Sequence, residues 1–293
     1  MASLKDLRGR INSVKSTRKI TQAMKMVAAA KLRKSQERIQ QMRPFAYKLS
    51  GLLQNLSAAQ SEGDADHWYS DVREERKILI IAVSSDRGLC GSFNSTVFKG
   101  VNRLIDEKYS SQFAKGNVTV LTIGKKSTDY FSKRKCSVLG DFSLLFHSLT
   151  FESVGRAAMF VMDAFQHHKF DKVELVYNEF KNVATQILCV EQFLPIVPPP
   201  AKPGTQINYI FQPDQDEIVA SLIPQSLKIQ LFKAVLESNA AENGARMTAM
   251  DKATENAGEL LKQLRLTYNR TRQAAITKEI LEIVGGAEAL KSS

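Results

Sequence analysis

The sequence predicts an α/β protein in which two long terminal helices pair as an antiparallel coiled coil around an inserted, Rossmann-like, mostly parallel α/β domain. Three observations lead to this prediction: no proline follows Pro224, apolar residues recur at steps of three and four near both ends, and the middle alternates short apolar runs with helix-like segments. Proline interrupts helices, and a 3.5-residue apolar repeat is typical of coiled coils. We place the N-terminal helix at 1–58, the α/β domain at 75–204 and the C-terminal helix at 212–293.

The proline-free C-terminal stretch covers 69 residues. As one helix it would be about 100 Å long, whereas a compact chain of this size is only about 50 Å across. Such a helix needs a partner along its length, and the N-terminal segment offers one. Two amphipathic helices of an ordinary bundle are the alternative, but the length favours a protruding pair.

Steps of three and four from Leu4 as far as Leu56 meet mostly apolar residues. The same walk from Met250 meets Ala253, Ala257, Leu260 and Leu264 and then degrades. The pattern does not fix the register of the pair. Pro44 is expected to kink the first helix, and Gly244 and Gly258 to weaken the second by about 1 kcal/mol each.

Two polar interruptions, Arg18–Lys25 and Thr267–Lys278, carry apolar residues on more than one face of the helix. A surface helix normally shows one apolar stripe. These stretches are therefore expected to be enclosed by something other than the opposite helix. The apolar residues concerned are Ile20, Met24, Met26 and Val27 in the first helix, and Leu266, Tyr268, Ile276, Ile280 and Ile283 in the second.

The central domain is predicted from short apolar runs that alternate with helical periods. Buried strands separated by helices are typical of a largely parallel sheet. The expected strands are Lys77–Val83, Val118–Ile123, Val173–Asn178 and Thr185–Phe193, and the expected helices are Ser92–Tyr109, Lys125–Lys133 and Phe151–His168. The link Pro195–Gly204, rich in proline and glycine, is expected to close the domain.

The charge is concentrated at one end of the chain. The formal net charge is +11, and residues 1–48 alone carry 13 basic and two acidic residues. Such a block indicates an acidic or polyanionic partner, or a targeting peptide. A mitochondrial transit peptide, a nucleic-acid-binding helical hairpin and a helix that slides against acidic protein partners all remain open on charge alone.

Composition excludes several other classes. No run approaches the roughly 18 to 20 apolar residues of a membrane helix. Cys90, Cys136 and Cys189 form no Cys-x-x-Cys pair, so neither a disulfide framework nor a zinc site is expected, and a reducing compartment fits best. The adjacent His167 and His168 point to different helix faces and chelate poorly.

The segment Ser84–Asn94 stands where a phosphate-binding loop would follow the first strand, but it matches neither common glycine-rich motif. A tight turn that needs Gly88 and Gly91 is the favoured interpretation. Cys90 at the following helix start could be a nucleophile of lowered pKa, which leaves a stand-alone α/β enzyme as an alternative. No sequence pattern supplies its partner base.

Several blocks together resemble the gamma subunit of F-type ATP synthases over nearly the whole chain. Lys15–Leu32 looks like that family's first helix and Ser85–Gly91 like its central loop. Ile276–Ala289 fits the family's C-terminal signature, and Ala245–Met250 and Tyr268–Gln273 fit the helix before it.

The resemblance implies a central rotor shaft. In that family the helix pair stands inside a ring of three alpha and three beta subunits, next to a central-stalk epsilon subunit (delta in mitochondria), and the base rests on the membrane c-ring, whose proton flow turns the shaft. Catalysis takes place on beta, so the chain is expected to be a non-catalytic subunit with no cofactor, no metal and no nucleic acid. It would lie peripherally on the energy-coupling membrane, on the cytoplasmic face in bacteria or the matrix face in mitochondria.

The resemblance also implies particular partner-contact residues. Those near the C-terminal end would engage and release beta during each turn: Arg272, Gln273, Thr277, Glu279 and Glu282. Met24 on the first helix and Arg87 in the central loop would face the lever loops of beta.

Overall fold

A computed structural model describes residues 3–59, 68–134, 136–196 and 215–291. Within it the chain forms two compact units, one made of residues 1–27 with 247–293 and the other of residues 28–246. Most of the predicted proline-rich link Pro195–Gly204 lies outside the described residues. In the described part, no helix combines the length and apolar character needed to cross a bilayer.

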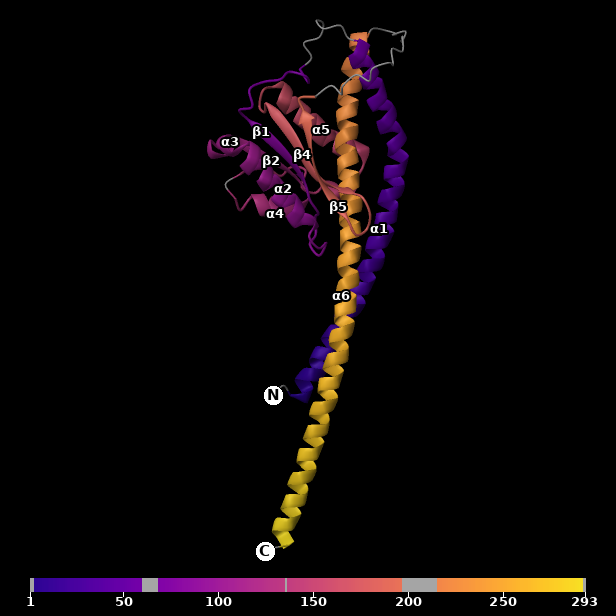
Figure 1. Ribbon diagram of the computed structural model, residues 1–293, viewed down its shortest axis with the longest axis vertical. Coiled ribbons are helices and arrows are strands. Elements are labelled where there is room, and N and C mark those ends of the chain that lie inside the picture. Colours follow the sequence, from indigo (N-terminus) through magenta and orange to yellow (C-terminus); the bar gives the residue numbers. More distant parts are fainter. Residues whose placement is uncertain (1–2, 60–67, 135, 197–214, 292–293) are drawn as a thin grey trace. The chain divides into compact units, whose positions relative to one another are not determined.

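The two terminal helices are α1, Leu4–Ala59, and α6, Gln215–Lys291 (Figure 1). Side-chain hydrogen bonds between them fix both direction and register. In the first unit, Arg8 donates to Tyr268 at 3.1 Å, the hydroxyls of Thr21 and Thr254 are 2.8 Å apart, and Lys25 donates to Asp251 at 2.5 Å. Numbers rise along α1 as they fall along α6, so the helices are antiparallel, as predicted.

In the second unit, Ser35 of α1 donates to Asn239 of α6 at 2.7 Å. The apolar walk along α1 follows the buried face well, because its members Leu7, Thr21, Ala28, Leu32, Ser35 and Ile39 are all buried. The walk along α6 was wrong at one step. Leu260 is 44% exposed whereas Leu261 is 5% exposed, so the seam passes through Leu261.

Both long helices continue through a proline, Pro44 in α1 and Pro224 in α6. Each proline removes one intrahelical hydrogen bond. Packing along a helix of this length can offset such a local loss, because most helical stability in proteins comes from tertiary contacts.

The central sheet has five strands in the order β3-β2-β1-β4-β5. The strands are β1 Ile78–Val83, β2 Val118–Ile123, β3 Ser137–Leu139, β4 Lys172–Phe180 and β5 Gln186–Leu194. The pairs of β1 with β2 and β4, and of β2 with β3, are parallel, while β5 pairs antiparallel with β4. The four predicted strands are confirmed, and β3 was not foreseen.

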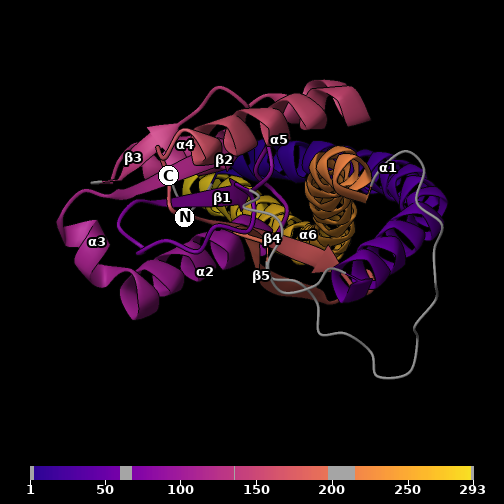
Figure 2. The same ribbon diagram turned by 90° about the horizontal axis from the view of Figure 1, so that it is seen from above.

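Helices cover both faces of the sheet. The α/β domain contains α2 Phe93–Lys108, α3 Ser110–Ala114, α4 Lys125–Phe131 and α5 Phe151–Gln166, with a short 3₁₀ turn at Leu145–Ser148. On one face α2 and α4 pack on Ile78, Ile80 and Ala82. On the other, α5 and the first part of α6 pack on Leu79, Ile81 and Val83, and α2 and α5 are seen on opposite sides of β1 (Figure 2).

This layering explains why β1 reads as an unbroken apolar run: all six of its residues are buried. A strand covered on both faces needs apolar side chains at every position rather than at every second one. The predicted fold class, a mostly parallel α/β domain inserted between paired terminal helices, is confirmed.

Candidate functional site

The central loop between β1 and α2 is held by its own polar side chains. Ser85 donates through its hydroxyl to the carbonyl oxygen of Arg87 at 2.7 Å, and its backbone N–H donates to Asn94 at 3.0 Å. Leu89 has φ 64° and Gly91 φ 59°, both left-handed. The expected need for glycine is therefore confirmed at Gly91 but wrong at Gly88, because the second left-handed position is Leu89.

The crevice beside this loop is filled by α6. In a doubly wound sheet, ligands bind at the carboxyl ends of the strands where the strand order reverses, which here is next to β1 and β4. Ala241 and Ala245 of α6 pack there against Cys90 and Phe93, with Phe180 partly buried beside them. The place where a nucleotide would sit in such a fold is occupied by the chain itself.

Arg246 completes this closure. Its guanidinium donates to the carbonyl oxygens of Gly88 and Arg87, the latter at 3.2 Å, and pairs with Glu242 one turn earlier. The loop thus presents carbonyl oxygens to a cation, whereas a phosphate-binding loop presents N–H groups to an anion. The geometry does not support the phosphate-loop interpretation of Ser84–Asn94.

The carboxyl of Glu242 is in an unusual environment for a charged group. Burial raises its pKa, and the adjacent Arg246 acts in the opposite direction. Glu237, five residues earlier on α6, is also buried, and burial again raises its pKa. Its carboxylate accepts a hydrogen bond from the Phe180 N–H at 3.4 Å and lies 3.9 Å from Arg43.

Cys90 does not have the environment of a nucleophile. It is 2% exposed, and burial raises the pKa of its thiol instead of lowering it. Its side-chain neighbours Ser85 and Asn94 offer no base that could remove the proton. The stand-alone enzyme that the sequence left open therefore has no activated thiol at this position.

The other thiols and the histidines offer no alternative centre. Burial and the nearby Glu179 raise the pKa of Cys189 to about 11. His167 contacts the carbonyl oxygen of Asp163 at 2.9 Å. Over the described ranges, no three His, Cys, Asp or Glu side chains are grouped closely enough to hold a metal ion.

The predicted partner contacts near the end of α6 are all on the surface. Arg272, Gln273, Thr277, Glu279 and Glu282 are exposed, and together they occupy three turns of one helix. Thr277 donates to the carbonyl oxygen of Gln273 at 3.0 Å, and Lys278 lies 3.5 Å from Glu282. Met24 is half-buried on α1 of the same unit, and Arg87 is exposed in the other unit.

Large apolar side chains are exposed in the first unit as well. That a partner encloses the two polar interruptions stays a prediction, because most of their apolar side chains are exposed in the described part of the chain. The exposed residues of the first unit are Ile20, Met26 and Val27 of α1, and Leu260, Leu266, Ile276, Ile280, Leu281, Ile283 and Val284 of α6. Sequence reasoning had placed Leu260 in the seam, and it did not single out Leu89 in the central loop, which is 66% exposed.

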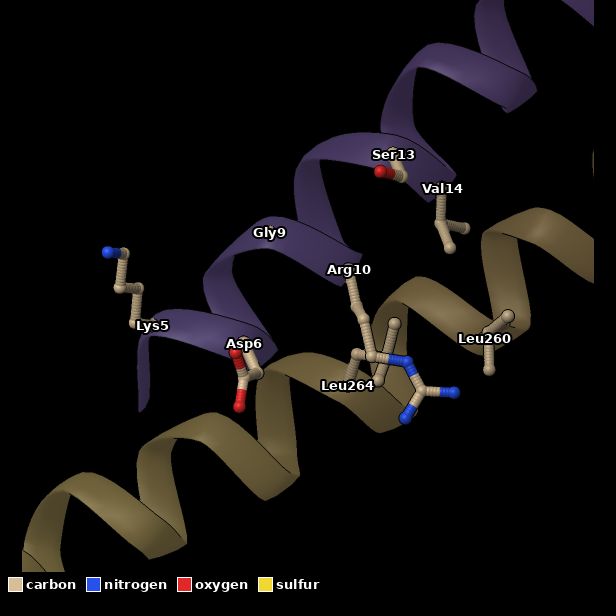
Figure 3. Close-up of a pocket in the computed structure, with 8 residues that line it drawn as sticks. All are labelled: Lys5, Asp6, Gly9, Arg10, Ser13, Val14, Leu260 and Leu264. Carbon is tan, nitrogen blue, oxygen red and sulfur yellow. The ribbon is translucent and has the colours of Figure 1, made fainter. Parts of the chain in front are cut away.

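A groove between the helices accounts for the exposure of Leu260. It is lined by one face of α1 near its start and by two leucines of α6, as Figure 3 shows. Gly9 leaves room at its rim, because a Cβ there would meet nothing within 4 Å. The lining residues are Lys5, Asp6, Gly9, Arg10, Ser13, Val14, Leu260 and Leu264.

Fold and site together define a coiled-coil protein with an inserted Rossmann-like domain whose ligand crevice is closed by its own helix. Comparison with known proteins agrees with this class. A family model described as ATP synthase matches residues 3–290. An ATP synthase gamma chain from Cytophaga hutchinsonii is 54% identical over 296 residues and covers 100% of both chains. One from Flavobacterium psychrophilum is 53% identical over 99% of this chain and 100% of that one.

The chain therefore belongs to the ATP synthase gamma chain family, as the sequence blocks indicated. Solved structures share the fold at low identity. A chain of the Euglena gracilis mitochondrial ATP synthase (OSCP/F1/c-ring) has a TM-score of 0.64 at 19% identity, covering 98% of this chain and 94% of that one. A chain of the Tetrahymena thermophila central stalk/c-ring has a TM-score of 0.57 at 23% identity, covering 80% and 99%. The nucleic-acid-binding alternative gains no support.

Proposed function

We propose that this chain is the central rotor shaft of an ATP synthase and transmits the rotation of a proton-driven c-ring to catalytic subunits. The observation that carries the proposal is the full-length identity of 54% to a gamma chain. The antiparallel pairing of α1 with α6, which reaches the contact between Arg8 and Tyr268, provides the paired helices that torque transmission requires.

The partners follow from the family and from the exposed surface. We infer that three alpha and three beta subunits surround the helix pair, that an epsilon or mitochondrial delta subunit joins it in the stalk, and that the c-ring carries its base. The uncovered apolar residues Ile276, Ile280 and Ile283 support an enclosing protein partner, since exposed apolar patches mark interaction sites. The complex would hold the chain peripherally at the cytoplasmic or matrix face of the membrane.

The shaft itself would perform no chemistry. ATP synthesis and hydrolysis would take place on beta, and the closed crevice beside Cys90 and Phe93 supports a domain that binds no nucleotide. Its task is to present contacts that beta engages and releases, for which we propose Met24, Arg87, Arg272, Gln273, Thr277, Glu279 and Glu282. Exposed ion pairs are worth about 0 to 1 kcal/mol and can be broken at each step, whereas a buried pair would resist rotation.

Charge reversal at Arg272 tests this function. Arg272→Glu should lower ATP-driven proton pumping by the assembled complex severalfold. The free energy of unfolding of the isolated chain should change by no more than about 0.5 kcal/mol, because Arg272 is exposed. Pumping in membrane vesicles and thermal melting of the purified chain are the two measurements.

Lys115→Glu is the matched control, since Lys115 is exposed on the α/β domain and is not among the proposed contacts. It should leave pumping unchanged. Parallel losses of melting temperature and assembly in Arg272→Glu would assign Arg272 a structural role. Failure of the wild-type chain to co-purify with other ATP synthase subunits from membranes would reject the proposed function as a whole.

A further inference from the structure

The ion pair between Glu242 and Arg246 differs from most other ion pairs in the described residues because both its side chains are largely buried. They are 13% and 12% exposed, against 56% and 85% for Glu37 and Arg33, which form an ion pair with the same four-residue spacing on α1. Arg246 also has further acceptors, the carbonyl oxygens of Gly88 and Arg87 in the central loop. One guanidinium thus connects α6 with a loop that precedes it by 158 positions.

The loop end of this connection is the backbone of Arg87. Its carbonyl oxygen accepts from Arg246 at 3.2 Å and from the Ser85 hydroxyl at 2.7 Å, with the Cys90 thiol at 3.9 Å. The side chain of Arg87 remains exposed. The backbone is therefore held from both sides while the charged group faces outwards.

The conformation of the loop also requires outside support. Leu89 has φ 64°, and a non-glycine residue in this region persists only where its surroundings over-determine it. The contacts of Arg246 lie on the two residues immediately before it. Without the contacts of Arg246, fewer interactions would hold Leu89 in its left-handed conformation.

Stability alone is a poor explanation for the pair. Burying two charges costs about as much free energy as their attraction returns, and the packing of Ala241 and Ala245 on Phe93 already holds α6 at this point. Charge-assisted hydrogen bonds from a guanidinium are directional, however. The Glu242–Arg246 pair therefore contributes a fixed orientation of the 85–91 loop relative to α6.

We propose that Arg246 and Glu242 are positioning residues that latch the 85–91 loop to α6, so that the Arg87 side chain moves with the helix as a fixed arm when it meets a catalytic subunit. The inference rests on the proposed function, because it assigns Arg87 a partner. Glu242 orients Arg246, Arg246 holds the loop carbonyls, and the loop presents Arg87.

Coupling in the assembled complex tests the latch. In membrane vesicles, Arg246→Gln should lower the ratio of ATP-driven proton pumping to ATP hydrolysis by about 10-fold, the factor expected from one lost hydrogen bond to a charged group. Arg33→Gln is the control, since it removes an exposed pair of the same spacing, and it should leave the ratio unchanged. A ratio for Arg246→Gln equal to that of the control overturns the latch.

A double variant separates positioning from structure. If Arg246 acts through Arg87, then Arg87→Ala should lower the ratio by itself, and adding Arg246→Gln should lower it no further. The proposal would be contradicted if the pumping-to-hydrolysis ratio of the double variant fell by the product of the two single effects. It would also be contradicted if Arg87→Ala left the ratio unchanged. Independent structural damage gives additive free energies, whereas residues that act as a unit do not.

Arg246→Gln alone leaves Glu242 buried without its partner, so the pair is also replaced together. Glu242→Leu with Arg246→Met should preserve packing and assembly and still lose coupling. In the complete complex, amide hydrogen exchange should become faster at 86–89 and stay unchanged in β1. Normal coupling in this variant rejects the latch, whereas a wild-type chain that joins no ATP synthase complex rejects the proposed function instead.

Discussion

Glu237 is a buried carboxyl whose ionisation should be visible in stability. Because burial raises its pKa above the reference of 4.5, the folded chain retains this proton at pH values where the unfolded chain has lost it. Stability should therefore fall as pH rises from about 4.5 through the raised pKa, by at most about 1.4 kcal/mol per pH unit. Glu237→Gln should remove this part of the pH dependence and be more stable than the wild type above that window.

The amide of the glutamine can still accept the hydrogen bond from Phe180 N–H, so the substitution changes charge and little else. Urea unfolding at a series of pH values measures the effect. Glu259→Gln on the exposed face of the same helix is the control and should leave the slope unaltered. A Glu237→Gln variant less stable than the wild type at high pH would show that Arg43, 3.9 Å away, outweighs burial.

The turn after β1 contains a residue whose conformation the sequence did not predict. The turn after β1 was attributed to Gly88 and Gly91, yet Leu89 takes the left-handed conformation and Gly88 has open space at its Cβ position. Leu is a poor candidate for φ above zero on local grounds. The residues just before Leu89 are held by Ser85 within the loop and by Arg246, which lies on a helix more than 150 positions away.

At the scale of elements, the strands with long apolar runs were predictable and the short ones were not. β1 and β2 match their predicted bounds to within a residue. β3 has only three residues, none of them buried, and α3 has five, so neither shows a periodicity that sequence could reveal. The register of α1 with α6 was likewise hidden, because polar residues such as Thr21 and Thr254 share the seam with apolar ones.

Gly244 and Gly258, both inside α6, should respond differently to the same substitution. A Cβ at Gly258 would lie 3.8 Å from the Arg18 side chain, at ordinary contact distance. Gly258→Ala should therefore raise the free energy of unfolding by about 0.5 to 1 kcal/mol, the gain in helix propensity. At Gly244 a Cβ would come within 3.1 Å of the Phe180 ring, so Gly244→Ala should lose that gain to the clash.

The comparison uses the urea concentrations at the unfolding midpoints of the two variants, provided that the slope of the unfolding free energy against urea concentration is unchanged. Each variant serves as the control for the other, because both make the same chemical change within one helix. Equal stabilisation would show that Phe180 moves aside without cost. Destabilisation by Gly258→Ala would show that the helix pair is packed more tightly there than the contact distances indicate.

For the whole molecule, the family and its fold could be predicted from sequence, because the C-terminal block Ile276–Ala289 and the central loop carry specific residues in order. The closed crevice could not. Nothing in the local pattern of Ala241, Ala245 or Arg246 says that this part of a long helix fills the site where a related fold would take a ligand. Contacts between segments this far apart depend on the folded arrangement rather than on any spacing in the chain.

The end of α6 should be ordered by partners and not by the chain itself. Arg8 contacts Tyr268 and α1 begins at Leu4, so residues 273–291 have no α1 residue beside them among those described. A single helix of this length is marginal in water, and Gly285 and Gly286 weaken it by about 1 kcal/mol each. In the isolated chain, amides at 273–291 should exchange nearly as fast as in an unfolded peptide, and in the assembled complex they should be strongly protected.

Hydrogen exchange of the isolated chain and of the complex measures this difference directly. Gly285→Ala together with Gly286→Ala should raise protection in the isolated chain, because a Cβ at either position meets nothing within 4 Å. Residues 250–264, which pack on α1, are the internal control and should be protected in both states. Full protection of 273–291 in the isolated chain would mean that the exposed Ile276, Ile280 and Ile283 need no covering partner, and the strongest structural support for an enclosed shaft would be lost.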